Sequence, residues 1–402
     1  MAVKKATHQE TRIHNRNLIL KTVFEAETIS RAEIARVTGL TRPTVSDVVN
    51  DLITEGLVEE VGIGSSIGGK SPILLSLVKD SRYMIGLNLA YDQFYGEVVN
   101  LRGEVKAAET IPVSGRDGEQ ALGLAYKILD RLTGSDLKPM VGIGVGTPGL
   151  VNTREGVVVN AVNLDWRNLP LARLLQDRYH LPTHIMNDSQ AAAIGEFVYG
   201  GGYPSDDSLV VINVGQGIGA GILIDGRLFQ GDGGSAGEIG HIFIQENGSE
   251  CRCGKHGCLE TLASTRAVLG RSQALASDFP ASGFSRNPED ITLDSLVGAF
   301  SSNDPLAEQV VLDAAHYLGL SIAGLVSTLD IQRFVLVGDM TRFGRRWLDA
   351  VREAAARTTL SELARDVRID MGKLDYHRSI LGASALILLD GYSLLFMNAS
   401  ND

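Results

Sequence analysis

Three cysteines and one histidine in this 402-residue chain have the types and the spacing of a metal site. Cys251, Cys253 and Cys258 fall together in CRCGKHGC, and His241 shortly precedes them. Three thiolates and an imidazole form a closed tetrahedral shell, which is typical of structural zinc because no position remains for an activated water. Free thiols without a role would be scattered, and a disulfide between Cys251 and Cys253 would be strained. We therefore predict structural Zn²⁺ at these residues.

The composition indicates a soluble α/β protein of about two or three domains. Hydrophobic residues make up 44% of the chain, and 45 residues are glycine. No apolar run reaches ~18 residues, and the amino terminus, MAVKKATHQE, lacks the apolar core of a signal peptide. We therefore expect no membrane partner and a cytoplasmic location, where thiols stay reduced and can hold metal.

Charge is distributed unevenly along the chain. The net charge of −11 speaks against nucleic acid as a partner of the chain as a whole. Residues 1–46, however, carry eight Lys or Arg against four Glu, a net of +4, which leaves −15 for the rest. We infer that the front of the chain has a different partner from the back.

A helix with one apolar stripe is predicted just after residue 40. Its apolar residues follow the i, i+3, i+4, i+7, i+8 spacing of a half-buried helix, at Val45, Val48, Val49, Leu52 and Ile53. Thr41 is placed to cap this helix, and Pro43 is tolerated in its first turn. Earlier helices are predicted over about 15–25 and 30–37, the second ending at Gly39, where a left-handed backbone is inexpensive. Three such helices predict a helix-turn-helix.

In the segment after these helices, apolar and polar residues alternate and a turn follows, as in a two-stranded β-wing. The helices and the wing together predict a DNA-binding domain over residues 1–80. Short or forked donors at the amino end of the third helix suit the major groove, and they are Thr41, Arg42, Thr44 and Ser46. The side chains placed to reach phosphates are Arg16, Arg31 and, at the tip of the wing, Lys70. Asp47, by contrast, would repel phosphates. The alternative is a small helical bundle used for dimerisation. We predict a double-stranded DNA operator as the partner.

From about residue 81, glycine-punctuated strands alternate with helical stretches, which predicts α/β layers. A faint repeat at an offset of 125 residues lays Asn88 on Asn213 and Gly96 on Gly221. We expect two lobes of similar plan, the first over 81–195 plus 378–402 and the second, with the zinc subsite, over 196–377. The Ser-, Ala- and Pro-rich segment 272–287 is expected to be a loop.

Five segments of this region resemble the consecutive signatures of the ROK (repressor, open reading frame, kinase) family. They are GIGVGTPGLV at 142–151, NDSQAAAIGE at 187–196, NVGQGIGAGI at 213–222, SAGEIGH at 235–241 and CRCGKHGCLE at 251–260. The resemblance implies a two-lobed actin-like (ribonuclease H-like) sugar kinase fold with a monosaccharide site and a structural zinc nearby. The preceding winged helix-turn-helix is similar to that of the family's sugar-responsive transcriptional regulators.

The positions that match the nucleotide contacts of family kinases depart from the kinase pattern. Those kinases have an acidic residue followed by two glycines and a threonine where this chain reads NLAYDQ from Asn88. Gln216 replaces the usual hydroxyl residue of the second phosphate turn, and Asp339 replaces one of two paired glycines. These departures predict a degenerate ATP site. The alternative is an active sugar kinase with a DNA-binding domain, in which Asp92 replaces the lost acid.

The positions that match the family's sugar contacts are kept. The resemblance implies contacts to sugar hydroxyls from Asn163, Asn187, Asp188, Glu238, His241 and Glu260. Carboxylates and amides suit this task because each can bridge adjacent hydroxyls. Asp188 is the general base position of the kinases, and without an ATP site we interpret it as a ligand, so no catalytic residue is assigned.

These observations predict a transcriptional regulator of carbohydrate metabolism, a repressor by expectation, with a monosaccharide or a derivative as effector. A homodimer or homotetramer is expected, because such regulators read twofold operators. His241 is expected to bind zinc through one ring nitrogen and to face a sugar hydroxyl with the other, so that the metal braces the sugar site. A zinc-sensing regulator is the remaining alternative.

Overall fold

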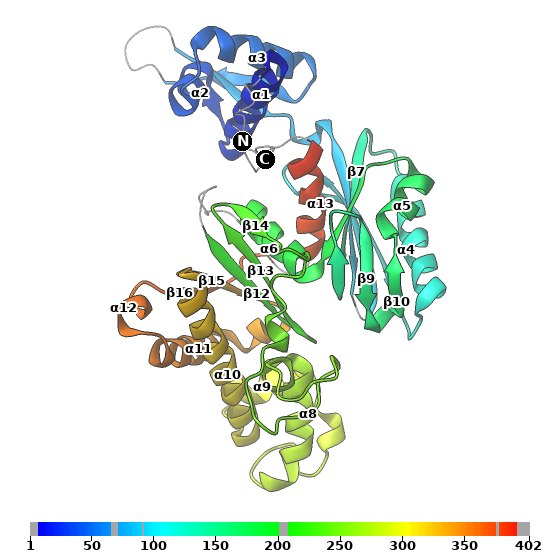
Figure 1. Ribbon diagram of the computed structural model, residues 1–402, viewed down its shortest axis with the longest axis vertical. Coiled ribbons are helices and arrows are strands. Elements are labelled where there is room, and N and C mark those ends of the chain that lie inside the picture. Colours follow the sequence, from blue (N-terminus) through cyan, green and yellow to red (C-terminus); the bar gives the residue numbers. More distant parts are fainter. Residues whose placement is uncertain (1–6, 66–70, 91, 201–207, 375–377, 392–402) are drawn as a thin grey trace. The chain divides into compact units, whose positions relative to one another are not determined.

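The computed structural model describes residues 7–65, 71–90, 92–200, 208–374 and 378–391 (Figure 1). The chain forms two compact units. The first comprises residues 1–147, 156–185 and 383–402, and the second comprises residues 148–155 and 186–382.

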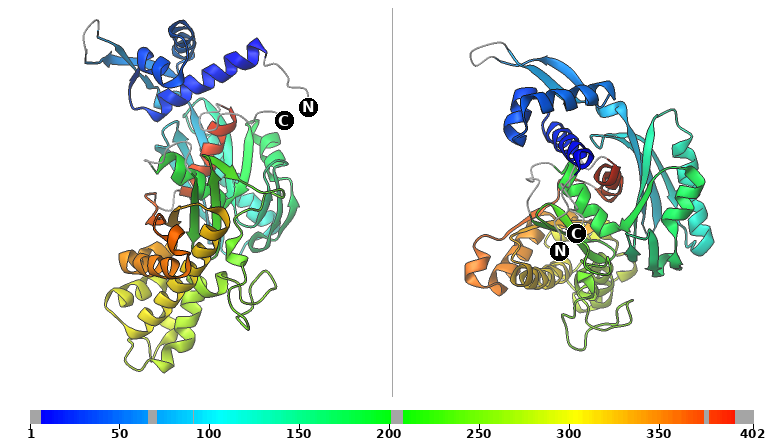
Figure 2. Two further views of the ribbon diagram at one scale, coloured as in Figure 1. Left: turned by 60° about the vertical axis from the view of Figure 1, so that its left-hand side comes forward. Right: turned by 45° about the horizontal axis from the view of Figure 1, so that its top comes forward.

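The amino-terminal part of the first unit is a winged helix-turn-helix, as predicted. Its helices are α1 (His8–Glu25), α2 (Arg31–Thr38) and α3 (Arg42–Thr54). Its sheet has the order β1-β3-β2, from β1 (Ile29–Ser30), β2 (Val58–Ile63) and β3 (Ile73–Leu77). β2 and β3 pair antiparallel and form the wing beside the helices (Figure 2). Helix α1 begins earlier than the predicted residue 15, because Thr7 and Glu10 cap one another's backbone amides in a capping box.

The predicted cap and stripe of α3 are confirmed. The Thr41 hydroxyl accepts a hydrogen bond from the Thr44 amide, and Gly39 has the expected left-handed backbone, with φ at 71°. The stripe faces the core of this small domain, with Val45, Val49 and Leu52 fully buried. The opposite, polar side of the amino end of α3 is therefore left on the surface.

The rest of the first unit is built on a five-stranded sheet with the order β11-β7-β4-β5-β6. The strands are β4 (Tyr83–Leu89), β5 (Gln93–Asn100), β6 (Val105–Pro112), β7 (Met140–Thr147) and β11 (Thr183–Asn187). Other elements here are α4 (Gly118–Thr133), β9 (Val157–Ala161), β10 (Trp166–Leu169) and α5 (Leu171–Tyr179). Gly144 on β7 lets helix α13 (Arg378–Gly391) approach, because a Cβ there would lie 1.7 Å from the Ala383 carbonyl oxygen.

The second unit repeats this plan. Its sheet has the order β14-β13-β12-β15-β16, from β12 (Leu209–Val214), β13 (Ile218–Ile224), β14 (Arg227–Phe229), β15 (Arg333–Val337) and β16 (Arg368–Met371). In each sheet the first strand, β4 or β12, pairs antiparallel with the next strand in sequence and parallel with a later one, β7 or β15. The sequence repeat therefore aligns residues at equivalent places in the two sheets, because Asn88 lies on β4 and Asn213 lies on β12.

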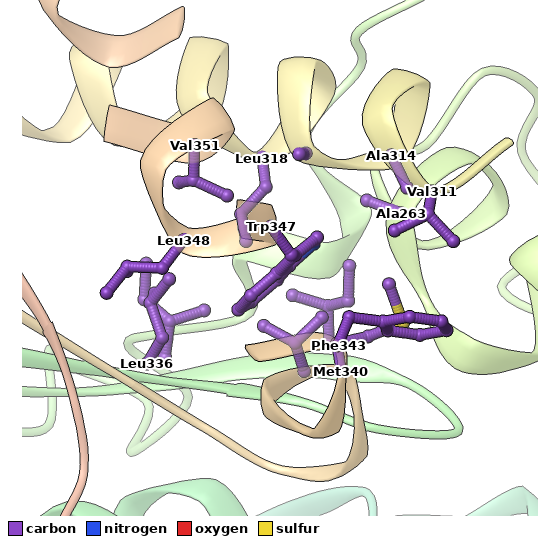
Figure 3. Packing of buried hydrophobic residues seen from close by; sticks show 14 of the residues in the cluster. Ala263, Val311, Ala314, Leu318, Leu336, Met340, Phe343, Trp347, Leu348 and Val351 are labelled. Atoms are coloured by element: carbon purple, nitrogen blue, oxygen red, sulfur yellow. The ribbon is translucent and has the colours of Figure 1, made fainter. Parts of the chain in front are cut away.

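The core of the second unit lies between its sheet and helices α10 (Pro305–Leu329) and α11 (Gly344–Thr358), which pack side by side (Figures 1 and 2). Trp347 fills the centre with 1% of its surface exposed, between Leu318 above and Met340 below (Figure 3). Helix α10 is long and apolar enough by composition to cross a membrane, but 61% of its most apolar window is buried inside the protein. Burial of this kind is expected of a core helix.

The remaining elements are β8 (Leu150–Asn152), α6 (Asp188–Tyr199), α7 (Glu260–Ala263), α8 (Thr265–Leu275), α9 (Leu293–Ser301) and α12 (Ser361–Ala364). The loop expected at 272–287 begins too early, because Ser272 lies inside α8 and is fully buried. Its hydroxyl donates to the Val268 carbonyl oxygen at 2.8 Å, which is how a serine is accommodated within a helix.

Candidate metal centre and carboxylate site

The four predicted metal ligands converge in the second unit. The Nδ1 atom of His241 and the Sγ atoms of Cys251, Cys253 and Cys258 all lie within 4.8 Å of one another. The sulfurs of Cys253 and Cys258 are 3.7 Å apart, and Cys251 Sγ is 3.6 Å from His241 Nδ1. Tetrahedral zinc with bonds of about 2.3 Å places its sulfurs about 3.8 Å apart. The donor set therefore fits a tetrahedral metal ion.

Tight turns bring these ligands together. The Cys251 amide donates to the Lys255 carbonyl oxygen at 2.7 Å, and Gly254 between them has φ at 81°. At Gly257, with φ at 71°, a Cβ would lie 1.9 Å from the Gln245 carbonyl oxygen, so only glycine fits. Burial, followed by the neighbouring thiols, raises the pKa of Cys258 to about 12. A bound cation would lower the pKa of Cys258 instead, because the thiolate is the form that binds a metal.

The two ring nitrogens of His241 face different partners. Nδ1 points to the thiols, whereas Nε2 lies 3.8 Å from Oε2 of Glu238. His241 ends the short 3-10 helix Ile239–His241, and Glu238 directly precedes that helix. A metal on Nδ1 would fix the ring, and with it the direction of Nε2.

Asn187 and Asp188 lie at the amino end of α6. Asn187 caps this helix, because its Oδ1 accepts hydrogen bonds from the amides of Ser189 and Gln190 at 2.9 and 3.3 Å. Its Nδ2 donates to the Gly149 carbonyl oxygen at 3.0 Å. Burial raises the pKa of Asp188 to about 6, and the nearby Ser189 hydroxyl only partly offsets this effect.

Glu260 begins α7, two residues after the ligand Cys258, and is 6% exposed. Its Oε2 accepts a hydrogen bond from the Ile218 amide at 3.2 Å. Its Oε1 lies 3.0 Å from an Arg266 nitrogen and 3.8 Å from an Arg252 nitrogen. Sequence reasoning missed both arginines, although Arg252 stands inside the cysteine motif.

Asp188, Glu238 and Glu260 are close enough for their charges to interact. The pKa of Glu238 is raised to about 7, mainly by burial and further by the negative charges of Asp188 and Glu260. The structure therefore brings three of the predicted sugar contacts into one electrostatically coupled group. Such a group favours a neutral, hydrogen-bonding ligand over an anion.

Glu238 is positioned by two residues that the sequence analysis did not single out, Gln190 and Gly237. Gln190 is 2% exposed, and its Nε2 donates to the carbonyl oxygens of Gly234 and Ala236 at 3.1 and 3.0 Å. Gly237 has φ at 101°, and a Cβ there would lie 1.9 Å from the Ala220 carbonyl oxygen. The only available signals were their places inside the NDSQ and SAGEIGH segments.

Asn163 lies on the 3-10 helix Val162–Leu164 of the first unit, whereas the five other predicted sugar contacts lie in the second unit. Its place beside those residues stays a prediction.

The predicted DNA contacts fall into two groups. Thr41 and Arg42 are exposed and Thr44 and Ser46 are partly exposed, all on the first turns of α3. Arg31, by contrast, pairs with Glu60 of the wing at 2.9 Å.

Arg16 and Lys70 were also predicted to reach phosphates. Arg16 pairs with Glu55 at 2.6 Å, so that it, like Arg31, joins elements of this small domain. Lys70 lies outside the described residues.

The positions that match kinase nucleotide contacts are also occupied by acids or amides. Asn88 Oδ1 is buried without a hydrogen-bond partner among the described residues. A Cβ at Gly215 would lie 3.9 Å from the Asp339 carboxylate, and one at Gly217 would lie 2.6 Å from that of Glu260. Two carboxylates therefore flank the turn that the sequence predicts to match the second phosphate turn of the kinases.

Comparison with known proteins identifies two matching families. The ROK family model matches residues 84–389, and a winged helix-turn-helix DNA-binding model matches residues 14–59. A xylose repressor of Caldicellulosiruptor bescii is 33% identical over 383 residues, covering 94% of this chain and 96% of the relative. An N-acetylglucosamine repressor of Escherichia coli O157:H7 is 30% identical over 366 residues, covering 89% and 88%.

Among solved structures, a ROK family transcriptional regulator, a homologue of the E. coli MLC protein, is similar over 96% of this chain and 98% of its own, with a TM-score of 0.83 and 26% identity. A ROK family glucokinase from Streptomyces griseus, in complex with glucose and AMPPNP, covers 76% of this chain and 98% of its own, with a TM-score of 0.69 and 27% identity.

We predict that Asp188→Asn raises stability at neutral pH. Asp188 has a pKa of about 6 in the folded protein against an ordinary value of 3.8. The folded state thus binds this proton more tightly, so the stability that it contributes is present at low pH and is lost as pH rises through about 6. The asparagine variant lacks this loss and should be more stable by about 1–3 kcal/mol at about pH 7.5.

Thermal melting at about pH 7.5 and pH 5 measures this difference, which should shrink at the lower pH. The control is Asp136→Asn, at an exposed aspartate, which should melt like the wild type at both pH values. Equal melting of Asp188→Asn and wild type at both pH values would contradict the assignment.

Proposed function

The chain belongs to the ROK family, and on that premise we propose that it is a DNA-binding transcriptional repressor with a monosaccharide or a sugar derivative as its effector. The observation that carries the proposal is the joining of a winged helix-turn-helix to a ROK domain in one chain. Relatives named as repressors align with both parts. We expect the protein to act in the cytoplasm, where its DNA is.

The amino end of α3 is proposed to read the operator. Thr41, Arg42, Thr44 and Ser46 lie on the side of α3 that its apolar stripe leaves exposed, which is the arrangement by which a recognition helix enters the major groove. Arg31 and Arg16 are proposed to hold the wing and helices in place, because both are paired within the domain. A homodimer would place two such helices on half-sites about 34 Å apart.

The coupled carboxylates are proposed to bind the sugar. Asp188, Glu238 and Glu260, with His241 and Asn187, offer several acceptors and a ring nitrogen to hydroxyl groups, and Asn163 is proposed to join them. Acceptors of this kind discriminate between epimers, because a hydroxyl in the wrong place leaves an acceptor unpaired. The negative charges of Asp188 and Glu260 beside Glu238 also make a neutral sugar a better ligand than an anion.

We propose that the chain does not phosphorylate this sugar. The Asp339 carboxylate beside Gly215 places negative charge where a nucleotide phosphate would need backbone amides, and Asn88 cannot supply the charge that helps to hold Mg²⁺. Asp188 then serves as a sugar ligand rather than as a general base.

The tetrahedral donor set is proposed to hold Zn²⁺, which would supply structure rather than chemistry because all four positions are filled by protein. The site residues explain why this matters for the sugar. His241 carries both a metal-facing and a Glu238-facing nitrogen, and Glu260 follows Cys258 by two residues. Zinc would therefore brace three sugar contacts at once.

Sugar binding and operator binding are expected to be linked. With operator fragments selected by the protein itself, saturating D-xylose, D-glucose or N-acetyl-D-glucosamine should change the operator affinity by about 5- to 150-fold, the usual range of such coupling. Fluorescence anisotropy measures this change. Arg42→Ala should weaken operator binding without altering sugar affinity, whereas Arg345→Ala, at an 85% exposed side chain of α11, should do neither.

An operator affinity that ignores a wide panel of monosaccharides and their phosphates would contradict the proposed function.

No sugar-dependent ATP turnover is expected. A coupled assay of ADP release with Mg-ATP and the sugar panel should give the same background rate for wild type and Asp188→Asn. ADP release that depends on sugar and disappears in Asp188→Asn would show a working kinase and overturn this part of the proposal.

Cys253→Ser is expected to lose zinc and sugar affinity together. The purified wild type should contain about one zinc per chain by mass spectrometry, and the variant much less. Its sugar affinity, measured by calorimetry, should fall at least about tenfold because His241 and Glu260 lose their brace. Lys255→Ala, at an exposed non-ligand position of the same turn, is the matched control. A zinc-free variant with normal sugar affinity would refute the brace.

A further inference from the structure

Two arginines of the first unit reach from the large sheet to the ends of two DNA-binding helices. Arg102 donates to the carbonyl oxygens of Phe24 and, at 3.1 Å, of Ala26, and its guanidinium lies 5.1 Å from the centre of the Phe24 ring. Arg82 donates to the Glu55 carbonyl oxygen at 3.1 Å. These carbonyls stand at the carboxyl ends of α1 and α3, where a helix lacks its own donors and carries partial negative charge.

The turn that carries Arg102 is held rigidly. Asn100 is fully buried, and its Oδ1 accepts hydrogen bonds from the amides of Arg102 and Glu104, both at 3.0 Å. Its Nδ2 donates to Asp80 at 2.8 Å. Gly103 completes the turn with φ at 75°. One buried amide therefore fixes the turn and ties it to the segment that links the winged helix to the sheet.

That linking segment is bound to the same turn a second time. The Leu101 amide donates to the Lys79 carbonyl oxygen at 3.0 Å, and the Lys79 ammonium pairs with Glu104 at 2.7 Å. Lys106 on β6 pairs with Asp80 at 2.8 Å. Exposed ion pairs are individually weak, but here they share partners with a buried side chain and so define one geometry.

Strand β5 connects the turn that carries Arg102 to the polar turn at the other end of the sheet. It begins at Gln93, the last residue of the segment that is predicted to match the kinases' first phosphate turn, and ends at Asn100. Seven residue steps span about 23 Å. The strand is bonded to β4 on one side and β6 on the other. Gly96 lets α4 press on it, since a Cβ there would lie 2.3 Å from Ile128 Cγ2. It is therefore a stiff element.

We propose that Arg102 is a positioning residue that transmits the effector state of the ROK domain to the winged helix. By holding the end of α1 at the end of β5, it makes a shift of β5 move the DNA-binding helices as one body. This inference rests on the proposed function, because it names a route by which the same effector regulates operator binding. A merely structural role would leave the response to sugar unchanged.

The test uses the full-length protein with zinc, and the variants Arg102→Ala and Arg102→Lys. Arg116→Ala is the matched control, because Arg116 also donates to a backbone carbonyl, of Pro112 at 3.3 Å, but within the sheet domain. Sugar affinity is measured by calorimetry with D-xylose and with N-acetyl-D-glucosamine. Operator affinity is measured by anisotropy with and without the same sugars.

In Arg102→Ala, sugar affinity is expected to stay within twofold of wild type, while the ratio of operator affinities without and with sugar falls to less than a third of its wild-type value. Arg102→Lys should be intermediate, because one ammonium cannot reproduce the fork to two carbonyls. Arg116→Ala should respond like wild type. A full response in Arg102→Ala overturns the inference.

Hydrogen–deuterium exchange tests the contact between Arg102 and the end of α1 without any sugar. Amides in the peptide over residues 22–30 should exchange at least about threefold faster in Arg102→Ala than in wild type or Arg116→Ala, because the end of α1 is released. Unchanged exchange overturns the inference as well. A wild-type protein that ignores every sugar contradicts the proposed function, whereas a responsive wild type with an equally responsive Arg102→Ala contradicts this inference alone.

Discussion

Mutual repulsion among three carboxylates is the constraint on which the rest of the site depends. Burial, and beyond it the negative charges of Asp188 and Glu260, raise the pKa of Glu238 to about 7, and left to themselves the three carboxylates would separate or take up protons. Separate devices hold them together. Asp188 follows a helix cap, Glu260 is held by Arg266 and a backbone amide, and Glu238 ends a loop fixed by Gln190. A polyol that bridges the three would relieve part of the cost.

The same constraint supports the proposal that the metal site and the sugar site belong together. His241 precedes the cysteine segment 251–258 and Glu260 follows it. Glycines with left-handed backbones allow the tight turns of this segment. On the proposed function, this regulator would hold the sugar much as the kinases of the family are expected to hold it. The proposed difference lies where a nucleotide is expected to bind in the kinases, at Asn88 and at Asp339 beside the Gly215 turn.

Much of this arrangement could be predicted from the sequence, because it is carried by local signals. The apolar stripe and Thr41 cap of α3, the cysteine spacing and the sequence repeat that aligns β4 with β12 are all visible as short patterns or motifs. The pairing of Arg31 with Glu60, and the reach of Arg102 to the end of α1, could not be predicted. Such contacts join residues 29 or 78 positions apart, and no periodicity encodes them.

The account stands on reciprocal coupling between the sugar site and the winged helix. Calorimetric titration of the most effective sugar into the protein, free and bound to its operator, measures this coupling from the sugar's side. Linkage requires that the operator change the sugar dissociation constant by the same factor by which the sugar changes operator affinity, expected to be about fivefold or more. A sugar dissociation constant that is the same with and without operator would contradict the account.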